Sequence, residues 1–204
     1  HLVSEFEADA EQIIRGFIYR LKKKRPYITL KIATSLDGKL ATGSGESKWI
    51  SNSFSRSRVQ LLRTQSDAIL VGSGTILKDQ PTLKASGNLS SCCQPLSIYL
   101  DAKLSLTLIG GKKLPDVVIH GPEIIAENKA KLEASSIHLI EVPILEKKLD
   151  LISATAALAD FGVTNLLVEG GGQLASNLLK NDLIDRIVHY ETGLILGSDG
   201  VPSF

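Results

Sequence analysis

Residues 165–179 read NLLVEGGGQLASNLL, in which a short apolar run is followed by three consecutive glycines and a second, partly apolar stretch. A continuous apolar run bounded by a turn signal is typical of a strand that is covered on both faces, as in a parallel sheet. We predict a strand over 165–169, then a glycine turn, then a helix over 173–179. A strand, a turn and a helix in this order form the repeating unit of α/β folds.

The same order occurs earlier in the chain, where DAILV at 67–71 leads into GSGT at 72–75. Further strands are predicted at 27–34, 96–101, 116–120, 137–141 and 184–190. Helices are predicted at 11–22, 51–66, 123–134 and 147–160. Strands that alternate with helices indicate a largely parallel central sheet with helices on both faces, so the predicted class is α/β.

The helix expected at 51–66 carries one mixed polar and apolar face, formed by Phe54, Arg58, Leu61, Leu62 and Gln65. Residues 84–95 instead contain Gly87, Asn88 and a cluster of serines. That composition favours a long mobile loop.

Composition limits the class of partner. A chain of 204 residues with 43% hydrophobic content can bury one substantial core, which predicts a single α/β domain. The net charge of +1, from 23 basic and 22 acidic residues, gives no electrostatic reason to expect nucleic acid or an anionic membrane surface. The apolar runs are far shorter than the roughly 20 residues that span a bilayer. A small-molecule partner fits this composition better.

The two cysteines, Cys92 and Cys93, are adjacent. Adjacent cysteines supply neither a loop-closing disulfide framework nor a CxxC metal clip, so a reducing cytoplasm is the expected location. The chain begins with His1 and contains no methionine. We therefore expect a preceding part of the gene product to be missing.

The glycine turns suit a phosphate ligand, because glycine lets a diphosphate approach main-chain N–H groups at the positive end of a helix. Taken singly they are weak signals, since such turns also use glycine only to turn the chain. Three glycines at 170–172 exceed that need and favour a close ligand. The dinucleotide fingerprint GxGxxG would begin at Gly72, but Leu77 stands where its third glycine is required. No GxxxxGK[ST] motif occurs in the chain. Glu169 is the carboxylate best placed to meet a ligand, and the alternative is a solvated acid at a strand end.

Several motifs resemble the reductase domain of the bacterial bifunctional riboflavin-biosynthesis deaminase/reductase. They are RPYITLK at 25–31, SLDGKLA at 35–41, GESKWIS at 45–51, LRTQSDAILVG at 62–72, GT at 74–75, DQPTL at 79–83 and VEGG at 168–171. The resemblance covers most of residues 12–204. It implies a dihydrofolate-reductase-like fold, NADPH as hydride donor, and 5-amino-6-(5-phosphoribosylamino)uracil as the substrate whose ribose becomes a ribityl chain.

The resemblance also implies a division of the chain and a set of site residues. Residues 1–24 would be an N-terminal helix and the remnant of a linker from a missing deaminase domain, and 25–204 the reductase domain without its last strand; a homodimer or higher homo-oligomer is expected. The implied cofactor contacts are Thr34, Trp49, Thr75, Asp79, Gly171, Gly172, Gln173, Leu174, Ala175, Ser176 and Asn177. The implied substrate contacts are Ser47, Arg63, Leu83 and Glu169.

The residue types suit this chemistry. Hydride delivery to C1 of an opened ribosylamine leaves a charge or an amine to be protonated, so an acid or a cation must stand near that carbon. We expect Lys31 in that role, with Asp79 and Glu169 as the other catalytic candidates; a surface strand lysine and a turn-opening aspartate are the alternatives. Arg63 could grip phosphate through its planar fork or be a solvated helical charge. Trp49 could form a flat wall for a cofactor ring or pack in the core.

The sequence departs from the family pattern in two places. Ser86 stands where relatives carry an arginine that helps to hold the substrate phosphate, and Lys84 could substitute as a point charge. The zinc deaminase half of the family carries H-x-E and a later P-C-x-x-C. HYE at 189–191 fits the first motif, but no cysteine follows it. We therefore expect no metal in this chain, a structural role for His189, and zinc only in the missing deaminase domain.

Two other functions remain open. A pteridine or dihydrofolate reductase would share the fold and NADPH but would need a carboxylate that pairs with a pterin ring. Asp37 is the candidate, although it lies in a tight turn where aspartate most simply bonds its own backbone. A catalytically silent subunit that binds nucleotide only for assembly is the second alternative, which Ser86 favours and which the retention of Lys31, Asp79 and Glu169 opposes.

Overall fold

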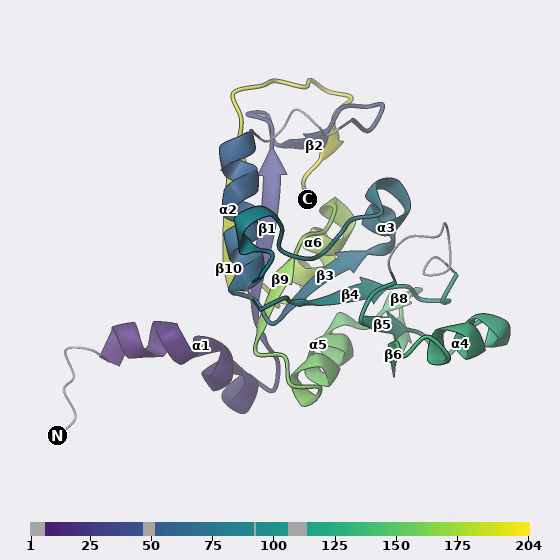
Figure 1. Ribbon diagram of the computed structural model, residues 1–204. Helices are drawn as coiled ribbons and strands as arrows, with labels where there is room; N and C mark the ends of the chain where they lie inside the picture. The colour runs from purple at the N-terminus through teal and green to yellow at the C-terminus, as the bar shows by residue number, and fades with distance from the viewer. Residues whose placement is uncertain (1–6, 47–51, 92, 106–113) are drawn as a thin grey trace.

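The computed structural model describes residues 7–46, 52–91, 93–105 and 114–204 (Figure 1). The helices in these residues are α1 (Glu7–Lys23), α2 (Ser53–Thr64), α3 (Ser73–Asp79), α4 (Ala126–Glu133), α5 (Leu151–Asp160), α6 (Gly172–Lys180) and a short 3-10 helix (Gly87–Leu89). The strands are β1 (Tyr27–Thr34), β2 (Lys39–Ala41), β3 (Ala68–Gly72), β4 (Leu96–Leu100), β5 (Val117–His120), β6 (His138–Glu141), β7 (Ile144–Leu145), β8 (Lys148–Leu149), β9 (Asn165–Val168), β10 (Arg186–Glu191) and β11 (Val201–Pro202).

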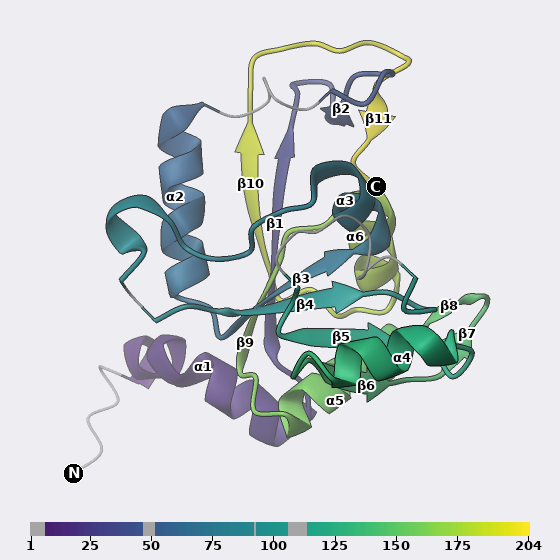
Figure 2. The ribbon, with the colours of Figure 1, turned by 45° about the vertical axis from the view of Figure 1, so that its right-hand side comes forward.

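A seven-stranded sheet in the order β10-β1-β9-β3-β4-β5-β6 forms the centre of the molecule. Each neighbouring pair in this sheet runs parallel, and β1 lies between β10 and β9. Two small antiparallel pairs, β11 with β2 and β7 with β8, lie at its margins (Figure 2). The prediction of a largely parallel α/β sheet is confirmed.

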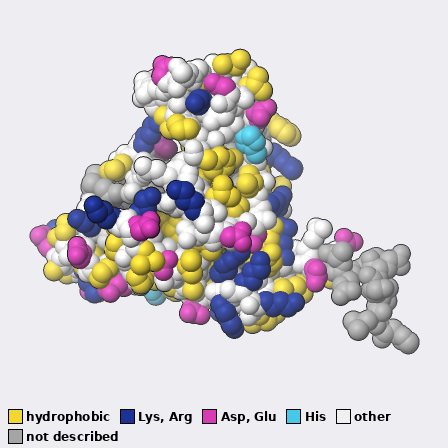
Figure 3. Space-filling model, turned by 180° about the vertical axis from the view of Figure 1, so that it is seen from behind, with side chains coloured by type: hydrophobic (Ala, Val, Ile, Leu, Met, Phe, Trp, Pro, Cys, Tyr) yellow, Lys and Arg dark blue, Asp and Glu magenta, His cyan; other side chains and the backbone are white. Residues whose placement is uncertain are grey.

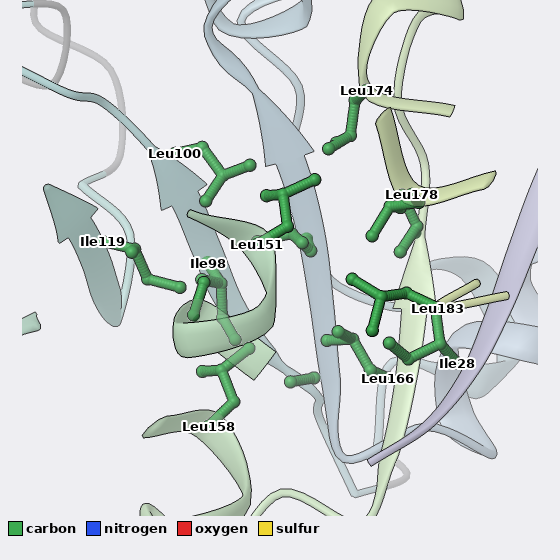
Figure 4. Packing of buried hydrophobic residues seen from close by; sticks show 14 of the residues in the cluster. Ile28, Ile98, Leu100, Ile119, Leu151, Leu158, Leu166, Leu174, Leu178 and Leu183 are labelled. Atoms are coloured by element: carbon green, nitrogen blue, oxygen red, sulfur yellow. The ribbon is translucent and has the colours of Figure 1, made fainter. Parts of the chain in front are cut away.

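The alternation of side chains along each strand separates two cores. In β3, Ala68 and Leu70 point to one face, and Ile69 and Val71 point to the other. The first face is covered by α5 and α6, which contribute Leu151, Leu158, Leu174 and Leu178 to its core (Figure 4). The second face is covered by α2, α3 and α4, which contribute Leu62, Ile76 and Leu132. Because both faces are buried, the strands read as continuous apolar runs, as parallel strands do.

The helix predicted at 147–160 is wrong over its first four residues. Residues 144–149 form the β7–β8 hairpin, whose turn places Glu146 and Lys147 at φ angles of 49° and 63°. The helix begins at Leu151 because the Asp150 carboxylate accepts hydrogen bonds from the N–H groups of Ile152 and Ser153. The helical spacing of residues in the sequence includes the hairpin at 144–149, and this hairpin has no glycine that would have indicated a turn.

The mixed face predicted on α2 is turned largely to solvent. Phe54 is 74% exposed, and Arg58, Leu61 and Gln65 are exposed as well. Val59, by contrast, is buried, and of the predicted face only Leu62 packs against the second core. The other side of α2 therefore meets the sheet, and it carries polar residues there.

The predicted loop at 84–95 contains the short 3-10 helix among its described residues. The Gln94 side chain closes this segment, because it accepts from the Ala85 N–H and donates to the Ser90 carbonyl. Mobility of the loop stays a prediction.

The described surface carries both signs of charge. Basic and acidic side chains lie beside one another across much of the face shown in Figure 3, with apolar side chains between them. Among the described residues, no helix is long and apolar enough to cross a membrane. The same residues contain no cluster of three or more His, Cys, Asp or Glu side chains that could hold a metal ion.

Candidate functional site

Three of the predicted site residues, Thr34, Glu169 and Thr75, lie at or just after the carboxyl ends of β1, β9 and β3. These three strands are neighbours in the sheet, so their carboxyl ends open onto one edge. Ligands of open α/β sheets bind in the crevice outside that edge. Glu169 directly follows β9 there, and its N–H bonds the carbonyl of Leu70 on β3 at 3.1 Å.

A cavity of about 210 Å³ lies between α2 and the β1 side of the sheet. It is lined by Lys31, Ala33, Ser55, Arg56, Val59, Gln60, Arg63, Glu169 and Tyr190. Ordinary small-molecule pockets measure roughly 300 Å³ or more. The cavity between the described walls is therefore smaller than an ordinary small-molecule pocket.

Arg63 and Glu169 form a two-pronged ion pair in the cavity wall. Arg63 Nε donates to Glu169 Oε1 at 2.7 Å, and Nη2 donates to Oε2 at 2.8 Å. The remaining Arg63 nitrogen, Nη1, donates to the carbonyls of Thr82 at 2.9 Å and Lys84 at 3.0 Å. The Arg63 and Glu169 side chains are 12% and 13% exposed. Neither is a solvated surface charge.

Lys31 enters the same cavity from the middle of β1. Its ammonium lies 5.9 Å from the centroid of the Tyr190 ring. Burial lowers the pKa of Lys31, the Glu169 carboxylate raises it and the Arg63 guanidinium lowers it, with a net shift below the ordinary value. A lysine shifted in this direction gives up its proton more readily than a surface lysine does.

The triple glycine at the start of α6 is used mainly for packing within the chain. An added Cβ at Gly170 would meet the Leu174 side chain at 2.8 Å, and one at Gly172 would meet the carbonyl oxygen of Pro202 at 2.9 Å. At Gly171 an added Cβ would meet no described atom within 4 Å. Only Gly171 therefore leaves open space for a ligand.

The predicted cofactor residues of α6 fall into two groups. Leu174 and Ala175 are buried in the core, so only their main chain could contact a cofactor. Gln173 is exposed, and Ser176 and Asn177 are half-buried. These three side chains remain accessible beside the Gly171 turn.

The other predicted cofactor residues that the structure describes lie at neighbouring strand ends. Thr34 is buried at the end of β1, where its hydroxyl lies 2.7 Å from His189 Nε2. His189 thus has a hydrogen-bonding partner in this chain, and its structural role stays a prediction. Thr75 is half-buried and Asp79 exposed on α3, which follows β3. Trp49 and Ser47 lie outside the described residues.

Two predicted substrate residues do not line the cavity. Leu83 is buried in the second core. Lys84 donates from Nζ to Asp116 Oδ2 and to the Pro95 carbonyl, both at 2.7 Å. The Ser86 N–H donates to the side-chain oxygen of the cavity residue Gln60 at 2.9 Å. A substrate role for Lys84 stays a prediction, and the structure gives its ammonium another partner.

The sequence did not predict six of the nine lining residues, which are Ala33, Ser55, Arg56, Val59, Gln60 and Tyr190. Arg56, Gln60 and Arg63 follow one another at helical spacing together with Val59, so they share one face of α2. That pattern was the available signal. The apolar side chains of Phe54 and Leu61 instead favoured a different face of the helix as the one that packs on the protein.

Fold and cavity together define the class of protein: an α/β protein with a parallel central sheet and a cavity walled by a lysine and an arginine–carboxylate pair. The family model described as the RibD C-terminal domain matches residues 26–204. The chain belongs to this family.

Known relatives agree with that assignment. The riboflavin biosynthesis protein RibD of Aquifex aeolicus is 34% identical over 195 residues, which cover 94% of this chain and 53% of that protein. The chain thus spans about half the length of the curated relatives it matches.

Solved structures share the fold. A deaminase/5-amino-6-(5-phosphoribosylamino)uracil reductase from Thermotoga maritima superposes with a TM-score of 0.74 at 28% identity, over 97% of this chain and 53% of that one. The Saccharomyces cerevisiae riboflavin biosynthesis reductase Rib7 gives 0.70 at 25% identity, over 96% of this chain and 88% of that one. The predicted dihydrofolate-reductase-like class is confirmed.

Proposed function

We propose that this chain is an NADPH-dependent reductase of riboflavin biosynthesis, which reduces the ribose of 5-amino-6-(5-phosphoribosylamino)uracil to a ribityl chain. The observation that carries the proposal is the convergence of Lys31, Arg63 and Glu169 on one cavity from three separate elements. The match to Rib7 supports the reductase half of the family, because this chain covers 88% of that protein.

The chain's own residues supply the proton chemistry and the binding. NADPH, when bound, supplies the hydride that reaches C1 of the opened sugar. Lys31, whose pKa is lowered by burial, holds the proton that the C1-linked nitrogen or oxygen then requires. The Glu169 carboxylate accepts hydrogen bonds from ligand hydroxyl or ring N–H groups, since its two hydrogen bonds from Arg63 hold it in one position.

The N-terminus of α6 fits a dinucleotide. Its N-cap residue, Gly171, forms no side-chain cap hydrogen bond and leaves open space where a Cβ would be. Helix N-termini of this kind favour phosphate groups. Gly171 would hold the diphosphate, and Gln173, Ser176 and Asn177 would contact the rest of the cofactor. Thr75 and Asp79, on α3 after the adjacent strand, are proposed to contact its nicotinamide half.

A pteridine reductase is disfavoured by the position of Asp37. Its carboxylate accepts hydrogen bonds from the Ser35 hydroxyl and from the N–H groups of Leu196 and Gly197. Asp37 is therefore occupied in joining two loops. The cytoplasmic location and the homo-oligomeric state stay predictions from the sequence.

NADPH oxidation tests the proposal with the purified chain and two substrates, 5-amino-6-(5-phosphoribosylamino)uracil and dihydrofolate. Turnover is expected with the first and not with the second. Arg58→Ala serves as the control, because Arg58 is exposed on α2 and does not line the cavity. Turnover of dihydrofolate would support the pteridine reductase instead, and turnover of neither would support the silent subunit.

A further inference from the structure

Tyr190 on β10 is an aromatic residue of the cavity wall, which it shares with Lys31 and Ala33 of β1. The two strands are parallel neighbours, and Tyr190 is the register partner of Ala33 (Figure 2). Because alternate residues of a strand face the same side, all three side chains share one face of the sheet. Lys31 and Tyr190 are therefore diagonal neighbours, a separation that long and aromatic side chains can bridge.

Within the described part of the chain, the Lys31 ammonium forms no hydrogen bond or ion pair. It lies over the Tyr190 ring, 5.9 Å from the ring centroid. An ammonium within about 6 Å of an aromatic ring face is attracted to that face. Glu169 lies in the same wall, but both of its carboxylate oxygens accept hydrogen bonds from Arg63. The ring is therefore the described neighbour that restrains the ammonium.

A proton donor works best when its acidic hydrogen is held at a fixed place beside the reacting atom. Lysine alone meets this need poorly, because its ammonium sits on a flexible four-carbon stem. The Tyr190 hydroxyl forms no hydrogen bond with a described residue. The contact between Tyr190 and Lys31 therefore runs through the ring face and does not involve the hydroxyl.

We propose, on the basis of the reductase function above, that Tyr190 is a positioning residue whose ring face holds the Lys31 ammonium at the cavity wall. Tyr190 acts through Lys31 and does not itself donate a proton or bind the substrate. The competing role is a hydroxyl that contacts the ligand directly. Positioning needs the ring, whereas direct contact by the hydroxyl needs the oxygen.

Two substitutions separate these roles. Tyr190→Phe keeps the ring and is expected to retain at least about half of the wild-type kcat, with KM within about twofold. Tyr190→Leu removes the ring, keeps the site apolar, and should lower kcat about tenfold with KM within about twofold. A rise in KM of about tenfold or more in Tyr190→Phe would overturn the proposal in favour of a hydroxyl–ligand contact. Wild-type kcat in Tyr190→Leu would overturn it as well.

Tyr27→Leu is the matched control. Tyr27 lies on the same strand as Lys31, its ring centroid is 4.5 Å from the Arg15 guanidinium carbon, and it does not line the cavity. This variant should keep the wild-type kcat, because it removes an aromatic–cation contact of the same kind at a distance from the cavity.

A double variant tests whether Tyr190 acts through Lys31. In a Lys31→Met background, Tyr190→Leu should lower kcat by less than about twofold, because the group that the ring positions is already gone. A loss in this background as large as the loss in wild type would show that Tyr190 acts without Lys31, and would overturn the proposal.

The pH profile gives a readout that a merely structural role would not move. The ring face favours the charged form of Lys31, so Tyr190→Leu should lower the pKa of this lysine and shift the alkaline limb of kcat downward by about half a pH unit. Tyr190→Phe and Tyr27→Leu should leave the limb in place. An unchanged limb in Tyr190→Leu would contradict the proposal. All variants keep the other charged groups of the cavity wall, which are Arg56, Arg63 and Glu169.

NMR of the purified chain with isotope-labelled lysines completes the test and does not depend on turnover. The Lys31 Hε resonance, assigned through Lys31→Met, should be shifted upfield by the ring in wild type and in Tyr190→Phe, and not in Tyr190→Leu. The same resonance position in all of these proteins would overturn the proposal. If wild type turned over neither substrate, the reductase assignment would fall, and this resonance would still decide whether the ring holds the ammonium.

Discussion

Two arginine–carboxylate pairs lie at opposite ends of the central sheet. Arg25 and Asp185 precede β1 and β10, and their two bonds measure 2.5 and 2.8 Å. Glu169 directly follows the carboxyl end of β9 and pairs with Arg63 in the last turn of α2, with bonds of 2.7 and 2.8 Å. In both pairs the arginine side chain is 12% exposed. Their local geometry is therefore nearly the same.

The two pairs differ in what else they contact. Asp185 also accepts a hydrogen bond from the Ile28 N–H at 2.9 Å, so the amino-end pair joins β1 to the start of β10. Neither of its members lines the cavity, whereas Arg63 and Glu169 both do. The hydrogen-bond geometry of an arginine–carboxylate pair thus does not indicate whether the pair lines the cavity. The end of the strands at which the pair lies says much more, because only carboxyl ends open onto a ligand crevice.

The largest effect is expected from a residue on β1 between the two pairs. Lys31→Met removes the proposed proton donor and should lower kcat about 10²–10⁴-fold. Stability should not fall, because the variant removes a buried ammonium whose burial is costly. Steady-state kinetics and thermal unfolding of the same sample measure both. Retention of more than about a tenth of wild-type kcat would rule out the proposed donor.

The amino-end pair should affect stability and leave catalysis intact. Arg25→Ala leaves Asp185 largely buried and should lower the free energy of unfolding by about 3 kcal/mol. The loss falls at the low end of the usual range because Lys23 remains 3.9 Å from Asp185. Urea unfolding measures the loss, and assays of the folded fraction measure kcat. A fall in kcat as large as that of Arg63→Ala would break the contrast between the two ends.

The smallest effect is expected at Asp37, near the carboxyl end of β1. Its pKa is lowered from 3.8 to about 2, first by the Ser35 hydroxyl and then by the Leu196 N–H. A lowered folded-state pKa adds stability above the unfolded value and loses it as the pH falls toward about 2. Asp37→Asn should therefore flatten the dependence of the unfolding midpoint on pH in this window. An unchanged slope would show that the loop contact does not depend on charge.

The fold was predictable wherever local signals agreed. The strand predicted at 27–34 has the same bounds in the structure, because β-branched residues and a turn marked both ends. The β7–β8 hairpin escaped prediction because its turn uses Glu146 and Lys147 in left-handed conformations, where glycine or asparagine is the usual signal.

The sequence could predict which residues belong to the candidate site, but it could not predict which residues pair with one another. Lys31, Arg63 and Glu169 were singled out, but no sequence pattern pairs Arg63 with a carboxylate 106 positions later. Lys84 shows the same limit, since Asp116 takes its ammonium through a contact that only the packed strands create. Which of several cations meets a ligand is decided by tertiary pairing, which leaves no periodic trace along the chain.

Because β1 pairs with β9 and β10, it is synthesised long before the two strands that flank it in the sheet. Ile28 and Asp185, which bond each other, are 157 residues apart in the chain. At translation rates of roughly 5–20 residues per second, Ile28 is synthesised about 8 to 30 seconds before Asp185. The apolar strand that carries Lys31 must wait that long without a partner, and long-range parallel pairing of this kind is slow. A nascent chain paused before β9 would expose β1 to chaperones or to aggregation, and the cavity would close last.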